Sequence, residues 1–153
     1  MSQFIFLDSG PLGLLTHPQR SAEVIAITLW LSRCLLSGAR LIVPAIVYYE
    51  IKRELLRAKK TFSIDRLDAF IDAAPWRYLP LSDEALRLAA ELWAQSRQAG
   101  HPTAESKALD IDVLIAAQAL SFGAAPHEVV ICTTNPKHLA QFITAKHWNE
   151  ILL

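Results

Sequence analysis

The sequence predicts an α/β fold in which a mainly parallel central sheet lies between two layers of helices. Short apolar runs alternate with longer helical patterns along the chain, which is typical of this class. The first run, FIFLD at residues 4–8, is apolar up to its last residue and is followed by SGP, as in a parallel strand that is covered on both faces. The chain has 153 residues, of which 52% are hydrophobic, enough for one substantial core. We therefore expect a single three-layer α/β/α domain over residues 1–153.

The other elements follow from local signals. Residues 21–38 predict a helix with Ser21 as its N-cap and Gly38 at its end, and residues 82–100 predict a helix that ends at Gly100. The remaining expected elements are, in chain order, a strand at 40–44, helices at 45–60 and 63–74, a short strand at 76–81, a helix from about Leu109, a strand at 128–134 and a terminal helix from about Pro136. This order favours a doubly wound sheet.

Composition narrows the class of protein. The formal net charge is zero, so attraction to nucleic acid or to an anionic membrane must come from local patches. Cys34 and Cys132 lie in apolar surroundings without metal-type spacing, which favours buried thiols in a reducing compartment. The N-terminal MSQFIFLDSG lacks the basic region and the apolar length of a signal peptide, and no run reaches the roughly 18 apolar residues of a membrane span. We expect a cytoplasmic protein that makes no use of a membrane.

Two aspartates, Asp110 and Asp112, head the otherwise apolar segment ALDIDVLIAAQAL at residues 108–120. A buried carboxylate is costly unless it is paired, hydrogen-bonded or bound to a metal. If this helix begins near Leu109, both aspartates lie in its first turn, where they can face the same crevice and where the helix dipole favours negative charge. Asp110 could instead serve only as the N-cap, an alternative that the residues leave open.

Further polar side chains are expected at the carboxyl ends of the strands, where ligands bind in open parallel sheets. Asp8 and Ser9 end the first strand, Glu50 lies in the helix that follows the second strand, and Thr134 and Asn135 end the last one. Structural alternatives exist: Asp8 in a turn, Glu50 in a surface ion pair and Asn135 at the entry to a helix.

Several carboxylates that share a crevice raise one another's pKa and destabilise the fold. A divalent cation removes this repulsion, so Asp8, Asp110 and Asp112 are the expected metal ligands. Oxygen ligands without cysteine or histidine at ligand spacing favour Mg²⁺ or Mn²⁺ and argue against zinc. Such a site can activate water for attack on a phosphodiester. The residues therefore predict metal-dependent nuclease chemistry.

The segments FLDSGPLGLL, VPAIVYYEIKREL, DVLIAAQAL and CTTNPKHLAQF, in this order, resemble the PIN domain family, in the branch of VapC-type toxins and related bacterial stand-alone proteins. The resemblance covers nearly the whole chain and implies a metal-dependent ribonuclease built on a parallel sheet. By position, Asp8 resembles the first acidic residue of the family, Glu50 the second and Asp112 the third, whereas Asp110 resembles an accessory acid. Asn135 stands where many members have a fourth aspartate, which implies a site with less charge and lower activity.

The resemblance also implies partners: an RNA substrate, a small antitoxin protein and a second copy of the chain. The basic run KRELLRAKK can contact phosphates or can be the solvated face of a helix. The expected substrate contacts are Ser9, Arg53, Arg57 and Thr134. The expected catalytic set, with Mg²⁺ or Mn²⁺, is Asp8, Glu50, Asp110, Asp112 and Asn135.

Competing function classes lack their motifs. The chain has no G-x-G-x-x-G and no G-K-[ST], which argues against a dinucleotide enzyme and a P-loop ATPase. An aspartyl phosphatase would be expected to have a second aspartate two residues after Asp8, where this chain has Gly10. The main alternative is a catalytically weak PIN-like module that binds nucleic acid or a protein partner. Metal-dependent cleavage of RNA distinguishes the two.

Overall fold

A five-stranded sheet forms the centre of the computed structural model, which describes residues 3–100 and 106–153. Its strands stand in the order β3-β2-β1-β4-β5, and neighbouring strands are parallel throughout. The strands are β1 Phe4–Leu7, β2 Arg40–Pro44, β3 Tyr78–Leu79, β4 Val129–Cys132 and β5 Ala145–Lys146. In the middle, Ile5 of β1 pairs with Leu41 of β2 and with Val130 of β4. The carboxyl ends of the strands therefore meet at one edge of the sheet.

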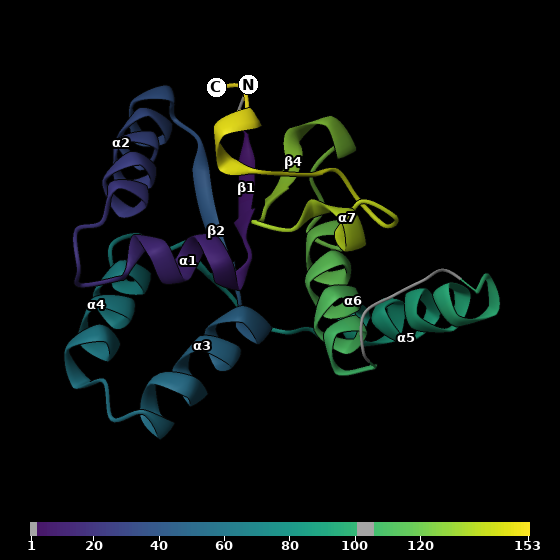
Figure 1. Cartoon of the computed structure of the whole chain (residues 1–153). Helices are drawn as coiled ribbons and strands as arrows, with labels where there is room; N and C mark the ends of the chain where they lie inside the picture. The colour runs from purple at the N-terminus through teal and green to yellow at the C-terminus, as the bar shows by residue number, and fades with distance from the viewer. Residues whose placement is uncertain (1–2, 101–105) are drawn as a thin grey trace.

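Helices pack on both sides of this sheet, which confirms the expected three-layer α/β/α architecture. Figure 1 shows α1, α2 and α4 on one side of β1, and α5 and α6 on the other. The α-helices of the described residues are α1 Ser9–Leu15, α2 Ala22–Ser37, α3 Ala45–Arg57, α4 Thr61–Asp72, α5 Asp83–Gln98, α6 Ser106–Leu120 and α7 Pro136–Leu139. Short 3₁₀ turns occur at Pro126–Glu128 and Trp148–Glu150.

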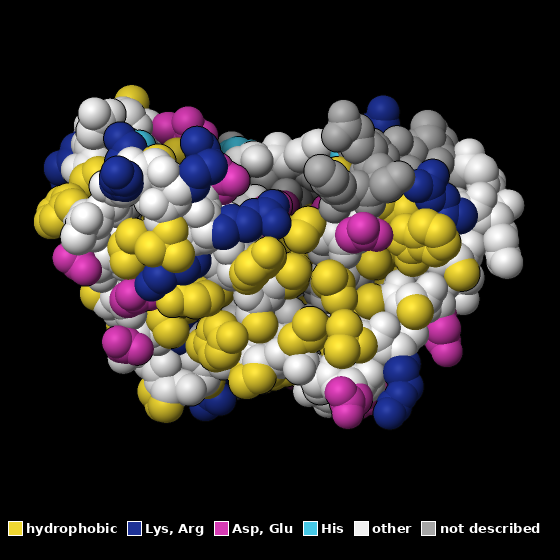
Figure 2. Space-filling view, turned by 90° about the horizontal axis from the view of Figure 1, so that it is seen from below, with side chains coloured by type: hydrophobic (Ala, Val, Ile, Leu, Met, Phe, Trp, Pro, Cys, Tyr) yellow, Lys and Arg dark blue, Asp and Glu magenta, His cyan; other side chains and the backbone are white. Residues whose placement is uncertain are grey.

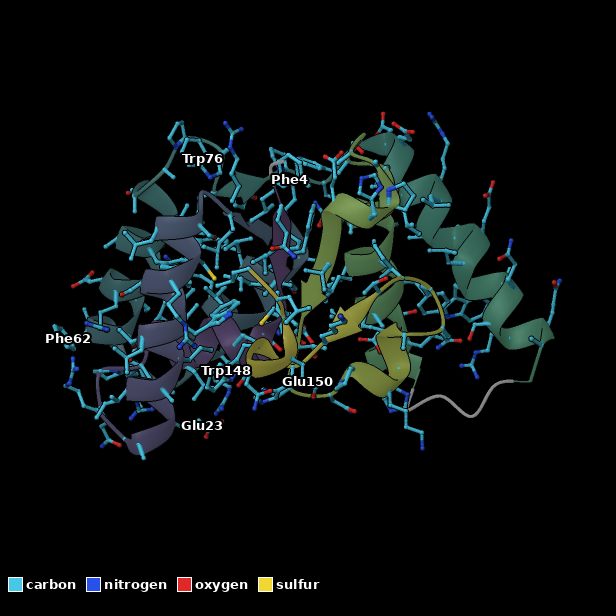
Figure 3. The ribbon with its side chains drawn as sticks, turned by 90° about the horizontal axis from the view of Figure 1, so that it is seen from above. Phe4, Glu23, Phe62, Trp76, Trp148 and Glu150 are labelled. Carbon is cyan, nitrogen blue, oxygen red and sulfur yellow. The ribbon has the colours of Figure 1, made fainter. Side chains whose placement is uncertain are left out.

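The central strands are buried because helices cover both faces of the sheet. Ile5, Phe6 and Leu7 of β1 are fully buried, so this strand lacks the alternation of a half-exposed one. The C-terminal segment closes the core at the opposite end from the carboxyl edge. There, Trp148 reaches toward α2, and its ring centroid lies 6.4 Å from that of Trp30 (Figure 3).

The two ends of α2 confirm the N-cap and the terminating glycine that the sequence predicts. The Ser21 side chain accepts the backbone N–H of Val24 at 3.2 Å, and Gly38 ends the helix with a φ of 80°, a conformation that favours glycine. Cys34 and Cys132 are buried free thiols, as expected. Among the helices that the structure describes, none is long and apolar enough to cross a bilayer.

Helix α6 is fixed against both the sheet and α5. Ala89 of α5 and Ala117 of α6 are buried where the two helices meet, and their small side chains let the helices approach closely. The side-chain amide of Gln118 donates to the carbonyls of Leu79 and Pro80, at 3.0 and 3.2 Å. These contacts set the rotation of α6 about its axis, and therefore which of its side chains face the carboxyl edge.

Several expected boundaries are wrong. Helix α6 begins at Ser106 and not near Leu109, and the expected terminal helix is only α7, after which the chain adds the edge strand β5. Helix α1 is not predicted by SGPLGLL, because two glycines and a proline favour helices poorly. It forms because the Asp8 side chain caps it and Leu12 is buried beneath it. The two-residue strands β3 and β5 are too short to give a clear sequence signal.

Candidate active site

Asp8 lies directly after β1, where two hydrogen bonds fix its carboxylate. Oδ1 accepts the backbone N–H of Ser9 at 2.7 Å, and Oδ2 accepts the hydroxyl of Thr133 at 2.7 Å. The backbone N–H of Asp8 donates to the carbonyl of Cys132 at 2.9 Å, which continues the β1–β4 pairing by one residue. The carboxylate is therefore held between the ends of β1 and β4, and each oxygen keeps acceptor capacity for a cation.

Thr133 is the residue of this site that the sequence analysis misses. It follows β4 directly, is 1% exposed, and its hydroxyl donates to Asp8 while accepting the backbone N–H of Asn135 at 3.1 Å. The signal that could have found it is its position, because it is the first polar residue at the carboxyl end of a wholly buried strand. Its hydroxyl ties the acid to the loop that follows β4.

Glu50 of α3 turns toward Asp8 and not toward the surface. Burial raises the pKa of its carboxyl and the Asp8 charge raises it further, while a hydrogen bond with the Ser9 side chain opposes both effects. Its Oε1 is buried and has no hydrogen-bond partner. The alternative of a surface ion pair applies instead to the neighbouring Glu54, which pairs with Arg57 at 2.9 Å. A buried carboxylate oxygen without a partner is a position for a cation or a water.

Asp112 of α6 is the third carboxylate of this group. Burial raises its pKa to about 7, and the charges of Asp8 and Glu50 raise it as well. Such a shift is expected where carboxylates share a crevice without a cation between them. Acids from three separate elements are therefore within electrostatic reach of one another, and we refer to Asp8, Glu50 and Asp112 as the acidic cluster.

Asp110 lies outside the acidic cluster. It is exposed and lines an apolar groove of about 450 Å³ between α5 and α6, beside Trp93 and Leu114. Residues two apart in a helix point about 200° away from each other. The expectation that both aspartates occupy a first turn and face one crevice is therefore wrong, because α6 begins at Ser106. For the same reason Asp110 is not the N-cap of this helix.

Thr134 and Asn135 are exposed beside the end of β4. Asn135 is the N-cap residue of α7 and Pro136 follows it, as the structural alternative expects, although its side chain makes no capping hydrogen bond. Its backbone is instead anchored through Thr133, which also holds Asp8. Thr134 lies against Gly10 of α1.

The basic side chains of α3 have different surroundings. Arg57 is engaged by Glu54, and the Arg53 guanidinium lies 5.2 Å from the centre of the Tyr49 ring. Arg53 follows Glu50 by one helical turn and Arg57 by two. Figure 2, which looks onto the carboxyl edge of the sheet, shows acidic side chains in a hollow with Lys and Arg side chains along one side. Of the two arginines, Arg53 is therefore the better placed to meet a ligand of the acidic cluster.

The donors of the acidic cluster suit a hard divalent cation. All are carboxylate oxygens, which Mg²⁺ and Mn²⁺ prefer. Within residues 3–100 and 106–153, no three His, Cys, Asp or Glu side chains are arranged as they stand to hold an ion. The unpaired Oε1 of Glu50 and the raised pKa of Asp112 are nevertheless what a cation between these groups would relieve. In their donor chemistry and charge, these residues therefore fit such an ion.

Comparison with known proteins identifies the family to which this fold belongs. The model of the PIN domain family matches residues 5–141. The chain belongs to the PIN domain family. The resemblance read from the four sequence segments is thereby confirmed. Among curated proteins, no sequence matches the chain.

Solved structures similar to this PIN domain include those of FitAcB and of two VapBC proteins. The structure of FitAcB from Neisseria gonorrhoeae is 20% identical with a TM-score of 0.71, and the match covers 96% of this chain and 99% of that one. VapBC2 from Rickettsia felis, bound to a DNA fragment from its promoter, is 17% identical with a TM-score of 0.69, covering 95% and 99%. VapBC-1 from nontypeable Haemophilus influenzae is 16% identical with a TM-score of 0.66, covering 97% and 100%. At these identities the similarity shows a shared fold.

Proposed function

We propose that this PIN domain is a metal-dependent endoribonuclease, and that it is the toxin of a toxin–antitoxin pair. The acidic cluster carries this proposal: Asp8, Glu50 and Asp112 converge at the carboxyl edge of the sheet, and the pKa of Asp112 is raised to about 7 by burial and by the other two acids. The family match and the similar FitAcB and VapBC2 structures support it.

In this proposal Asp8 and Asp112 hold Mg²⁺ or Mn²⁺, and Glu50 orients the attacking water. A bound divalent ion supplies charge neutralisation at the phosphodiester and makes water reactive near neutral pH. Thr133 keeps the Asp8 carboxylate in place through its 2.7 Å hydrogen bond. Asn135 contributes a neutral amide where a fourth acid would add charge, so we expect low activity and a preference for Mn²⁺, whose coordination is less demanding. Asp110 is not part of the proposed set.

The substrate side of the proposal concerns RNA phosphates. Ser9 and Thr134 offer hydroxyls beside Asp8, and Arg53 offers a cation one turn after Glu50. Arg57 is the weakest of the expected contacts, because Glu54 already holds its guanidinium. Substitution of Arg53 should therefore weaken RNA binding more than substitution of Arg57.

Two protein partners belong to the same proposal. The family resemblance implies a small antitoxin for this chain, and the similarity to the FitAcB and VapBC-1 structures supports it. A second copy of the chain is supported by the surface: Tyr49, Leu86 and Trp93 are 55%, 46% and 37% exposed, and Figure 2 shows hydrophobic side chains in a band across this face. The free thiols Cys34 and Cys132 agree with a cytoplasmic location.

The alternative of a catalytically weak PIN-like module has one observation in its favour. Asn135 replaces an acid that many members have, and a site with fewer charges binds a cation less tightly. Such a module would bind RNA or a protein partner without cleaving RNA.

Cleavage of a mixed single-stranded and structured RNA pool tests the proposal. We expect cleavage by the wild type with Mn²⁺, none with EDTA, and a loss of at least about 100-fold for Asp112→Asn. Asp110→Asn is the matched control, because it makes the same change two residues away on the opposite side of α6, and it should keep wild-type activity. Activity that survives EDTA and Asp112→Asn would reveal a contaminating nuclease. Tight RNA and Mn²⁺ binding without cleavage would support the non-catalytic module instead.

A further inference from the structure

Gly10, the second residue of α1, lies unusually close to the loop that follows β4. A methyl group on Gly10 would stand 2.6 Å from Oγ1 of Thr134, 2.9 Å from its Cγ2 and 3.3 Å from its Cβ. The glycines with positive φ in the described chain are Gly38, Gly100 and Gly123, so Gly10 is not required by its backbone conformation. It is required by the close approach of Thr134.

Rotation of the Thr134 side chain cannot relieve this contact. Oγ1 and Cγ2 occupy two of the three staggered positions on Cβ, and both of these positions face Gly10. Threonine has only one hydrogen for the three positions, so a heavy atom faces Gly10 in every rotamer. A larger residue at position 10 must therefore move the loop backbone and α1 apart.

Thr134 lies in the loop between Thr133, which contacts Asp8, and Asn135, which contacts Thr133. Thr133 donates to Asp8 Oδ2 at 2.7 Å and accepts the Asn135 N–H at 3.1 Å. We propose that Gly10 and Thr134 form a spacing contact that sets the positions of Thr133 and Asn135 relative to Asp8. Gly10 is then a positioning residue for the acidic cluster. The effect on metal binding and cleavage rests on the proposed function, whereas the spacing contact itself does not.

Four variants test this inference: Gly10→Ala, Gly13→Ala, Thr134→Ala and the double variant Gly10→Ala with Thr134→Ala. Gly13 is the matched control, because it lies in the same helix and a methyl group there meets nothing within 4 Å. Gly10→Ala should lower Tm by about 3–8 °C through overpacking, whereas Gly13→Ala should leave Tm unchanged or raise it. Gly10→Ala should also weaken Mn²⁺ binding, measured by calorimetry, and RNA cleavage by about tenfold each.

The double variant decides the cause. Thr134→Ala removes Oγ1 and Cγ2, so the double variant should return to the Tm and Mn²⁺ affinity of Thr134→Ala alone. If Gly10→Ala behaves like Gly13→Ala, or if the double variant stays as impaired as Gly10→Ala, the spacing contact is refuted. If the wild type neither binds Mn²⁺ nor cleaves RNA, the proposed function fails. The Tm values of the four variants still decide the contact in that case.

Discussion

The two sides of helix α6 carry the same residue type in opposite environments. Asp112 faces Asp8 and Glu50, and burial together with their charges raises its pKa to about 7. Asp110 lies exposed in the groove beside α5, among apolar side chains. A groove of about 450 Å³ would by its size suggest a ligand site, but its lining holds one carboxylate. The acidic cluster contains three, so the proposed site rests on the convergence of charge and not on the volume of a groove.

Metal binding is the strongest test of this difference between the acidic cluster and Asp110. Asp8→Asn should weaken Mn²⁺ binding by at least about 100-fold, because it removes a negative charge from a site that has few of them. Asp110→Asn should change the affinity less than about twofold, since its carboxylate is exposed on the far side of the helix. Isothermal titration calorimetry at fixed salt measures both. Equal affinities for the two variants would show that the cluster does not bind the ion.

Removal of the Thr133 hydroxyl should have the next largest effect. Thr133→Val leaves Asp8 Oδ2 without its donor and the Asn135 N–H without its acceptor, and should lower the free energy of unfolding by about 1–3 kcal/mol. Thr134→Val is the matched control, because it keeps the branched shape of an exposed side chain, and should stay within about 0.5 kcal/mol. Urea denaturation measures both. A loss of stability shared equally by the two variants would contradict the role given to the Thr133 hydroxyl.

The raised pKa of Asp112 predicts the pH dependence of the metal-free protein. Its ordinary value is 3.8 and its folded value is about 7, so between these pH values the folded protein keeps a proton that the unfolded chain loses. Stability should therefore fall as pH rises from about 4 to about 7, and then level off.

In EDTA at pH 8, Asp112→Asn should thus raise the free energy of unfolding by about 1–2 kcal/mol. A wild-type stability that does not decline across this window would show that Asp112 is not strained by its neighbours.

A substitution in the apolar groove between α5 and α6 should have the smallest effect on activity. Trp93→Ser removes an exposed aromatic ring from its lining and should leave RNA cleavage within about twofold, because the groove takes no part in the proposed reaction. The same change should weaken self-association in sedimentation velocity if the apolar face holds a second copy. A large loss of cleavage with unchanged folding would show that the groove and the crevice are coupled.

Local patterns in the sequence were enough for the framework of this protein. The buried run of β1 and the capped helix α2 follow from neighbours along the chain, and so does the placement of Asp8 and Thr134 at strand ends. The kind of metal ion that we propose also follows from the residue types, because carboxylates without nearby cysteine or histidine ligands favour a hard cation. The order of the four segments along the chain was enough to predict the PIN domain family.

Only the tertiary structure decided which acids share a space. Asp110 and Asp112 have similar sequence surroundings, and they separate because α6 begins at Ser106 and Gln118 fixes its rotation against the carbonyls of Leu79 and Pro80. The inward turn of Glu50 and the bond from Thr133 to Asp8 join residues far apart in the chain. Sequence periodicity reports which face of a helix is apolar, but the meeting of faces depends on packing between elements, which no local pattern contains.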